Sequence, residues 1–269
     1  MDVGYEDGRW RHDALTFDLI AWATDWILTP QELQGFGQAN SVVLLQKALS
    51  RIYSSEKFER RGEIGELLLH IILRRFMNSE KVISRLYFKD AANDTVKGFD
   101  AVHVVERSDS QGEFLELWLG ESKFYKDSGQ AVKAVIEELR EHLKANYLRS
   151  EFAAISDKVP AGWKHEATIR ALLDRTKSLD KVFKRVVVPV FITFNSAVSA
   201  RHFETTDAYL AEIREELLGE WDDFKEEFSG TELPREVRVH LILLPMSSKA
   251  DLIEAFDGRL KAWQRVLKV

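Results

Sequence analysis

The stretch that decides the fold runs from Gly98 to Phe124 and reads GFDAVHVVERSDSQGEFLELWLGESKF. Two runs rich in β-branched and aromatic residues, Phe99–Glu106 and Phe114–Lys123, flank the segment Ser108–Gly112. Ser, Asp and Gly favour a turn between such runs. The pattern therefore predicts two antiparallel strands joined as a hairpin.

The second strand of this hairpin has an apolar face that ends in charged residues. Side chains alternate along a strand, so three leucines share a face with Glu121 and Lys123. The other face carries Phe114, Glu116, Trp118, Gly120 and Ser122. A carboxylate and an ammonium that extend a buried face are costly unless they are paired or bind a metal ion. Their position predicts a functional site where the strand ends.

Asp100 supplies a second carboxylate from the first strand. If the hairpin is symmetric about Asp109 and Ser110, residue 100 lies opposite residue 119 and shares a face with Glu121. Diagonal neighbours of this kind lie roughly 7–8 Å apart. A slip of one residue would move Asp100 to the opposite face, so the register is a prediction.

Asp100, Glu121 and Lys123 together suit the hydrolysis of a phosphodiester. Carboxylate oxygens are preferred ligands of Mg²⁺, and a bound ion of this kind activates water and neutralises phosphate charge. An ammonium can stabilise charge in the transition state. We predict that all three residues are catalytic, that Asp100 and Glu121 are metal ligands, and that the cofactor is Mg²⁺ or Mn²⁺.

An upstream helix at about residues 60–78 adds two acids. Glu63 and Glu66 lie three positions apart, so they are neighbours on the helix surface. We predict Glu66 as a catalytic metal ligand and Glu63 as a further ligand; the alternative is that acidic residues simply favour the helix N-terminus. Gly62 and Gly65, which cost about 1 kcal/mol each relative to alanine, are expected to allow close approach of the sheet or of a phosphate backbone.

An acid-x-Lys triplet alone is a weak signal, because Asp223–Lys225 is a second copy. That copy lies in an acidic helical stretch without an upstream strand that bears an aspartate, so we assign it to a solvated surface. Glu121–Lys123 follows a hairpin that carries Asp100 and precedes a helix. This context favours a functional site over a surface ion pair.

The remaining pattern predicts a mixed sheet flanked by helices. Helices are expected at about 13–28, 38–53 and 60–78, at Asp127–Tyr147, through most of 151–180, at Thr206–Phe228 and at Lys249–Leu267. Strands are expected at Val82–Phe88, in the hairpin, at Arg185–Phe194 and at Val237–Leu244. Arg185–Phe194 is a near-continuous apolar run, as expected of a strand covered on both faces.

We predict a single domain over residues 1–269, because no linker or repeat divides the chain. Residues 1–55 form an N-terminal helical elaboration, residues 60–194 the core, and residues 195–269 a C-terminal strand and helices. Extra helices are therefore expected at both termini.

Composition excludes several functions. The chain has no cysteine, which rules out disulfides and thiol chemistry, and it has no Walker-type phosphate loop. It has no apolar run long enough for a membrane helix, and we do not expect its acidic N-terminal segment to act as a secretory signal, so we expect a cytoplasmic protein without a membrane partner.

The net charge of −6 means that DNA contacts must come from basic patches or from a partner. The candidate patches are Arg60–Arg61, Arg74–Arg75, Lys123/Lys126/Lys133 and Lys181/Lys184/Arg185, and a solvated surface is favoured for any single one. Tyr125 and Lys126 are candidate contacts with the nucleic-acid backbone. His70 and His103 are expected to be structural.

Glu63/Glu66, Gly98–Asp100 and Gly120–Lys123 resemble the motif series of PD-(D/E)xK nucleases. The order of elements from about 60 to 148 is similar to that superfamily's restriction-endonuclease-like core, although Phe99 replaces the proline that names the motif. The likeness extends over most of the chain and is sharpest between 60 and 130, where the sequence resembles the nuclease subunits of the Hachiman antiphage defence system.

This resemblance implies a Mg²⁺-dependent deoxyribonuclease that is the effector of an antiphage complex. Its implied partners are DNA and a superfamily 2 helicase that restrains the nuclease until foreign or damaged DNA is sensed. By resemblance, Gln130 contacts a phosphate or water; a polar residue at a helix start is the alternative. The competing functions are a non-catalytic nuclease-like subunit that regulates a helicase and a stand-alone restriction-type enzyme. DNA against RNA preference, specificity and trigger stay open.

Overall fold

The fold is built on a five-stranded sheet with the strand order β3-β4-β5-β6-β7. The computed structural model describes residues 1–52, 62–84, 98–110 and 112–266. The strands are β3 (Glu80–Ser84), β4 (Ala101–Asp109), β5 (Gly112–Phe124), β6 (Val186–Asn195) and β7 (Arg238–Met246). β3, β4 and β5 pair antiparallel, whereas β5, β6 and β7 pair parallel. The sheet is therefore mixed, as predicted.

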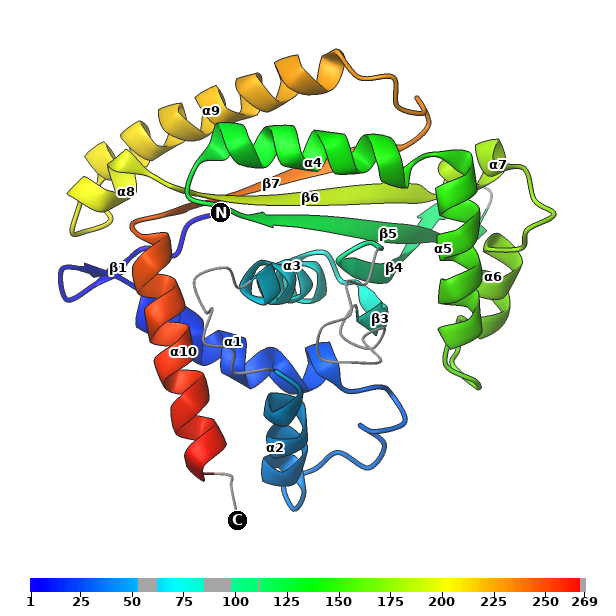
Figure 1. Ribbon diagram of the computed structural model, residues 1–269, viewed down its shortest axis with the longest axis horizontal. Helices are drawn as coiled ribbons and strands as arrows, with labels where there is room; N and C mark the ends of the chain where they lie inside the picture. Colours follow the sequence, from blue (N-terminus) through cyan, green and yellow to red (C-terminus); the bar gives the residue numbers. More distant parts are fainter. Residues whose placement is uncertain (53–61, 85–97, 111, 267–269) are drawn as a thin grey trace.

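Helices cover both faces of this sheet (Figure 1). One face carries α4 (Ser128–His142) and α9 (Asp207–Ser229), and the other carries α3 (Gly62–Phe76) with α1 (His12–Ile27) beyond it. α2 (Ser41–Arg51) and α10 (Lys249–Val266) pack against α1. The other elements are β1 (Tyr5–Glu6), β2 (Arg9–Trp10), α5 (Ala145–Lys158), α6 (Glu166–Leu172), α7 (Leu179–Phe183) and α8 (Ala197–Arg201).

Strand alternation divides the apolar core into one cluster on each face. The leucines of β5 that share a face with Glu121 pack with the apolar stripe of α4, for example Leu117 with Val135 in one buried cluster. Trp118, on the other face, belongs to the cluster around α3. Because α3 is buried around its whole circumference from Ile64 to Leu73, it is the central helix of that layer.

The predicted helix Asp127–Tyr147 is wrong in one respect, because it is two helices. α4 ends at His142, Lys144 is extended with a ψ of 137°, and α5 begins at Ala145. The buried residues of α4 end with Leu139, and those of α5 resume on a separate face with Leu148 and Phe152. The break lets α5 run in a different direction from α4, beside the end of the sheet (Figure 1).

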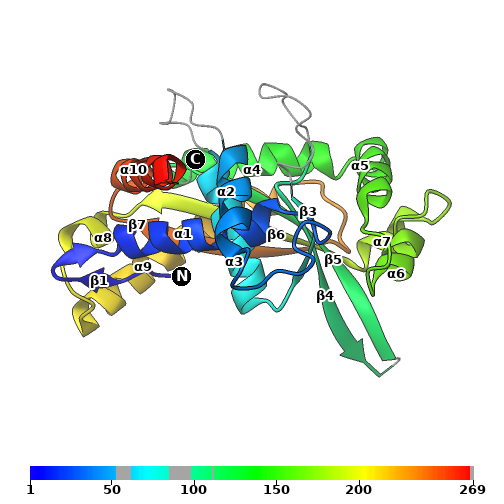
Figure 2. The same cartoon turned by 90° about the horizontal axis from the view of Figure 1, so that it is seen from below.

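The hairpin register differs from the prediction by two residues. Val102 lies opposite Leu119 and Ala101 opposite Gly120, so the next step outward places Asp100 opposite Glu121 rather than opposite residue 119. A two-residue slip keeps every side chain on its predicted face. The hairpin is also longer than predicted and projects from the body of the molecule (Figure 2).

Several predicted segments fall partly outside the described residues. These are the helix start at 60–61 with its Arg60–Arg61 patch, the strand end at 85–88, position 111 of the turn and Leu267. Within the described part, β6 is buried from Val186 to Phe194, which confirms a strand covered on both faces. None of the described helices is both long and apolar enough to cross a membrane.

Candidate active site

Asp100, Glu121 and Lys123 lie where β4 begins and β5 ends. Their exposed fractions are 3%, 1% and 7% respectively. Asp100 immediately precedes β4, and its charge acts on both Glu121 and Lys123. The structure therefore brings the three sequence-predicted residues together as a buried cluster.

Asp100 is held at the edge of β5 by Ser122. The backbone N–H and the hydroxyl of Ser122 donate to Oδ2 of Asp100 over 2.8 and 2.9 Å. The chain enters this position through Gly98, whose φ is 148°. A Cβ at Gly98 would lie 2.9 Å from Oε2 of Glu151, the end of a flexible side chain that can shift, so it is the backbone conformation that requires glycine there.

Two side chains of α4 complete the cluster, and the sequence analysis did not identify either of them. The Nδ1 atom of His142 lies 2.6 Å from Oε1 of Glu121, and Lys123 forms an ion pair with Glu138. Glu138 and His142 are four positions apart, so they project from one face of the helix. The ring of His142 stacks on Tyr147 with centroids 4.6 Å apart.

The electrostatics of this cluster are dominated by carboxylates. Burial, and then the charge of Asp100, raise the pKa of Glu121 well above its ordinary value. Burial opposes the charged form of Lys123, but Glu121 and Glu138 outweigh it and raise the lysine pKa. Burial works against ionised Glu138 as well, and Lys123 overcomes it so that this pKa is lowered. Three carboxylates thus surround one ammonium.

This donor set fits a divalent cation. Asp100 and Glu121 present hard oxygen donors of the kind that Mg²⁺ and Mn²⁺ prefer. A neighbouring carboxylate raises the pKa of Glu121 because two like charges are close together. A cation between the two acids would cancel that repulsion, and the predicted Mg²⁺ or Mn²⁺ stays a prediction.

The helix that carries Glu63 and Glu66 packs on the end of β5 through Gly65. A Cβ on Gly65 would lie 3.0 Å from Cβ of Phe124 and 3.3 Å from Oγ of Ser122, which confirms that Gly65 allows close approach to the sheet. No described residue lies within 4 Å of the corresponding position at Gly62, so the sheet does not approach there, and approach of a phosphate backbone stays a prediction. Glu66 is buried and Glu63 is half-buried. Their roles as ligands stay predictions.

The residues predicted to contact nucleic acid lie in the segment after β5 and in the first turn of α4. Tyr125 is half-buried, and Lys126 and Gln130 are exposed. The backbone N–H of Gln130 donates to Oδ1 of Asp127, the N-cap of α4. Gln130 is eight residues from Glu138, about 12 Å along a helix. Tyr125, Lys126 and Gln130 therefore stay predicted contacts beside the cluster.

Other sequence assignments are settled by burial. Asp223 and Lys225 are exposed on α9, which confirms a solvated second triplet. His70 and His103 are buried and lie 3.2 Å apart between Nδ1 and Nε2, which confirms a structural role. The surface interpretation is wrong for Arg74, whose Nε donates to Oδ2 of Asp25 over 3.0 Å.

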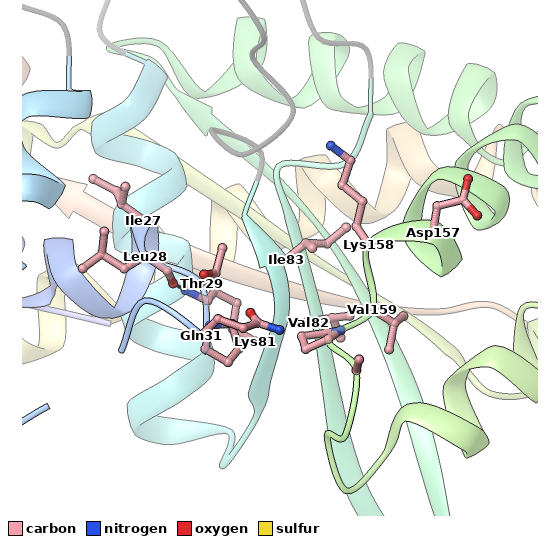
Figure 3. A pocket seen from close by; sticks show the side chains of 13 residues that line it. Ile27, Leu28, Thr29, Gln31, Lys81, Val82, Ile83, Asp157, Lys158 and Val159 are labelled. Carbon is pink, nitrogen blue, oxygen red and sulfur yellow. Dashed lines mark hydrogen bonds between the residues drawn. The ribbon is translucent and has the colours of Figure 1, made fainter. Parts of the chain in front are cut away.

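Figure 3 shows a hollow of about 330 Å³ whose lining includes no residue of the acid–lysine cluster. The end of α1, β3 and residues 157–161 enclose it. Nζ of Lys81 donates to the backbone oxygens of Leu28 and Trp26 over 2.7 and 3.2 Å, and burial lowers its pKa to about 8. Lys81 thus caps the C-terminus of α1 by donating hydrogen bonds to its last carbonyl oxygens.

The fold and the cluster together define a class of mixed α/β protein in which two acids and a lysine meet at the ends of paired strands. A family model described as HamA matches residues 1–260. The chain belongs to the HamA family, and it is a subunit of the Hachiman antiviral defence system. None of the curated proteins compared with the chain matches it.

Proposed function

We propose that this HamA protein is a Mg²⁺-dependent deoxyribonuclease and the effector subunit of a complex with a helicase. The observation that carries the proposal is the burial of Asp100, Glu121 and Lys123 at adjoining strand ends. A buried group of like charges is unfavourable for stability unless a ligand compensates it. The resemblance of these motifs to PD-(D/E)xK nucleases supports the same activity.

Each residue has a defined task in this proposal. Asp100 and Glu121 hold the ion, with Glu66 reaching the site from α3. When bound, the ion supplies an activated water and neutralises charge on the phosphodiester. The ammonium of Lys123 stabilises the extra negative charge of the transition state. Glu138 is a positioning residue, because its ion pair keeps Lys123 protonated and oriented.

In this proposal the helicase partner supplies most of the DNA affinity, because the nuclease subunit itself is negatively charged. With a net charge of −6, the subunit repels the DNA backbone at long range. A partner that holds the DNA would deliver it to the site and supply the specificity for foreign or damaged molecules. Lys126, Tyr125 and Gln130 then make only local backbone contacts.

A second candidate function is a non-catalytic subunit that regulates the helicase. It is favoured by the contacts of Glu121 with His142 and of Lys123 with Glu138, because such pairs also hold a strand end without any chemistry.

The test is DNA degradation by the full-length chain with Mg²⁺, alone and with its helicase partner. Glu121→Ala and Lys123→Ala should each reduce cleavage by at least about 100-fold while circular dichroism stays unchanged. The matched controls are Asp223→Ala and Lys225→Ala in the exposed triplet, which should cleave like the wild type. Wild-type cleavage by both site variants would refute the proposal, and a wild type without cleavage under any of these conditions would favour the regulatory subunit.

A further inference from the structure

A second group of possible metal ligands lies at the opposite end of β4. Glu80 of β3, Glu106 of β4 and His165, the residue before α6, each offer one ligand atom, and these atoms lie within 4.8 Å of one another. Glu106 is six residues from Asp100, or about 20 Å along a strand. The group is therefore separate from the proposed nuclease site.

His165 is the member that points to a ligand. It is only 9% exposed, and its Nε2 atom lies 3.0 Å from Oε1 of Glu106 and 3.7 Å from Oε1 of Glu80. The ring aligns with neither oxygen, so Nε2 forms no hydrogen bond with any described residue. A buried imidazole nitrogen without a hydrogen bond is costly unless something else binds it.

The spacing of these atoms suits a transition-metal ion. Zn²⁺ binds nitrogen and oxygen ligands at about 2.0–2.2 Å, which sets neighbouring ligand atoms about 3–3.5 Å apart. The separations of 3.0 and 3.7 Å between Nε2 of His165 and the two carboxylate oxygens lie close to that range. An imidazole donor favours zinc-like ions over Mg²⁺. Nε1 of Trp163 donates to the remaining oxygen of Glu80 over 3.3 Å, as an outer-shell partner that orients a ligand.

Lys164 occupies the position of a cation in this group. Its ammonium lies 2.5 Å from Oε1 of Glu80 and 3.1 Å from Oε1 of Glu106, and its side chain is 56% exposed. A cation between the same two oxygens is therefore already favourable. An exposed lysine is held weakly, so a doubly charged ion that also binds His165 can displace it.

We propose that Glu80, Glu106 and His165 bind one divalent transition-metal ion, with Zn²⁺ as the best match. The ion replaces Lys164 and fastens the segment before α6 to β3, the edge strand of the sheet. This metal site is separate from the proposed nuclease site, and membership of the HamA family does not by itself imply it. Because the ion binds the folded chain, the midpoint of thermal unfolding should rise with Zn²⁺ concentration.

The experiment titrates Zn²⁺ into full-length Glu121→Ala protein, in which the proposed nuclease site is removed, and follows binding by calorimetry. One ion should bind, a tenfold excess of Mg²⁺ should not displace it, and Lys164→Ala should tighten binding. His165→Ala should weaken binding at least about tenfold. The matched control is His202→Ala, because His202 also contacts a glutamate, Glu212, and it should leave binding unchanged.

Two results would overturn the proposal: no Zn²⁺ binding by the Glu121→Ala protein, or equal affinity after His165→Ala. If His165→Ala fails to fold, Glu106→Gln replaces it, because that carboxylate is exposed on β4 and its loss should weaken binding equally. Unchanged affinity in Glu106→Gln would likewise overturn the site. Loss of DNA cleavage is not a readout here, so this test is independent of the proposed function.

Discussion

The two faces of the β4–β5 pair each bury a polar cluster, and the clusters differ in charge balance. On the α4 face, Asp100, Glu121 and Glu138 surround Lys123, so negative charge is in excess. On the α3 face, one hydrogen-bonded chain runs from Ser79 through His103 and His70 to Asp25. Arg74 closes this chain by donating to both Asp25 and the carbonyl oxygen of Ser79.

The histidine chain can satisfy all its members without any ligand. If the Ser79 hydroxyl donates to His103, His103 donates to His70, and His70 donates to Asp25, then both rings are neutral. Burial lowers the pKa of His70 to about 4, which agrees with a neutral ring. In the acid–lysine cluster, three acids face Lys123 and His142, and burial together with the charge of Asp100 raises the pKa of Glu121. Charge excess, rather than burial alone, therefore marks the candidate functional site.

The largest expected effect is a difference in the stability of two matched variants. Asp25→Asn should lower the free energy of unfolding by about 2–3 kcal/mol, because it removes a charged acceptor from His70 and Arg74. Glu121→Gln should leave stability unchanged or raise it, because it removes a buried acid that is repelled by its neighbours. Urea denaturation measures both.

Asp222→Asn on the exposed face of α9 is the control for this pair and should behave as the wild type. A Glu121→Gln protein that is destabilised as much as Asp25→Asn would show that the acid–lysine cluster is also a balanced structural network. That outcome would remove the distinction between the two faces.

Acidification should destabilise the protein through the histidine chain. The folded pKa of His70 is about 4 against an ordinary value of 6.5, so the unfolded state binds more protons between these values. The stabilisation is present above about pH 6.5 and is lost as pH falls toward 4, and about 2 kcal/mol should disappear between pH 7 and pH 5.

This pH series is best measured on Glu121→Gln. The raised pKa of Glu121 acts with the opposite sign, because its folded form holds a proton at pH values where the unfolded form has lost it. Acid should therefore destabilise Glu121→Gln more steeply than the wild type. Equal slopes for the two proteins would contradict the raised pKa.

The smallest expected effect is that of Glu138→Gln on DNA cleavage. Loss of this carboxylate should reduce cleavage about tenfold and lower the pKa of Lys123. The alkaline limb of the pH profile should therefore move to lower pH, and Glu138→Asp should partly restore it. A reduced rate with an unshifted profile would mean that Glu138 is only structural.

Much of the fold could be predicted from local patterns in the sequence. The alternation of leucines with Trp118 identified the two faces of β5, and the apolar run in β6 identified a central strand. The short hairpin of β1 and β2 was not predicted, although Asp7 and Gly8 form an Asp-Gly turn in which both residues have positive φ. The break after His142 was not predicted either, because no Gly or Pro marks it.

The site could be predicted only where its residues belong to one hairpin. Asp100, Glu121 and Lys123 follow from strand pairing, and a two-residue error in register did not change their face. Glu138 and His142 reach the cluster from a helix, so the angle at which α4 packs on the sheet decides the contact. For the same reason, Asp25 as the partner of His70 could not be predicted from the sequence.

The most direct test of the account is Mn²⁺ binding to the acid–lysine cluster, measured by electron paramagnetic resonance. The measurement uses the His165→Ala protein, so that the proposed second metal site does not contribute. The account predicts that Mn²⁺ binds and that Glu121→Gln or Asp100→Asn weakens binding at least about tenfold, whereas Asp25→Asn does not. Equal Mn²⁺ affinity in all of these proteins would contradict the claim that the excess negative charge on the α4 face holds a catalytic ion.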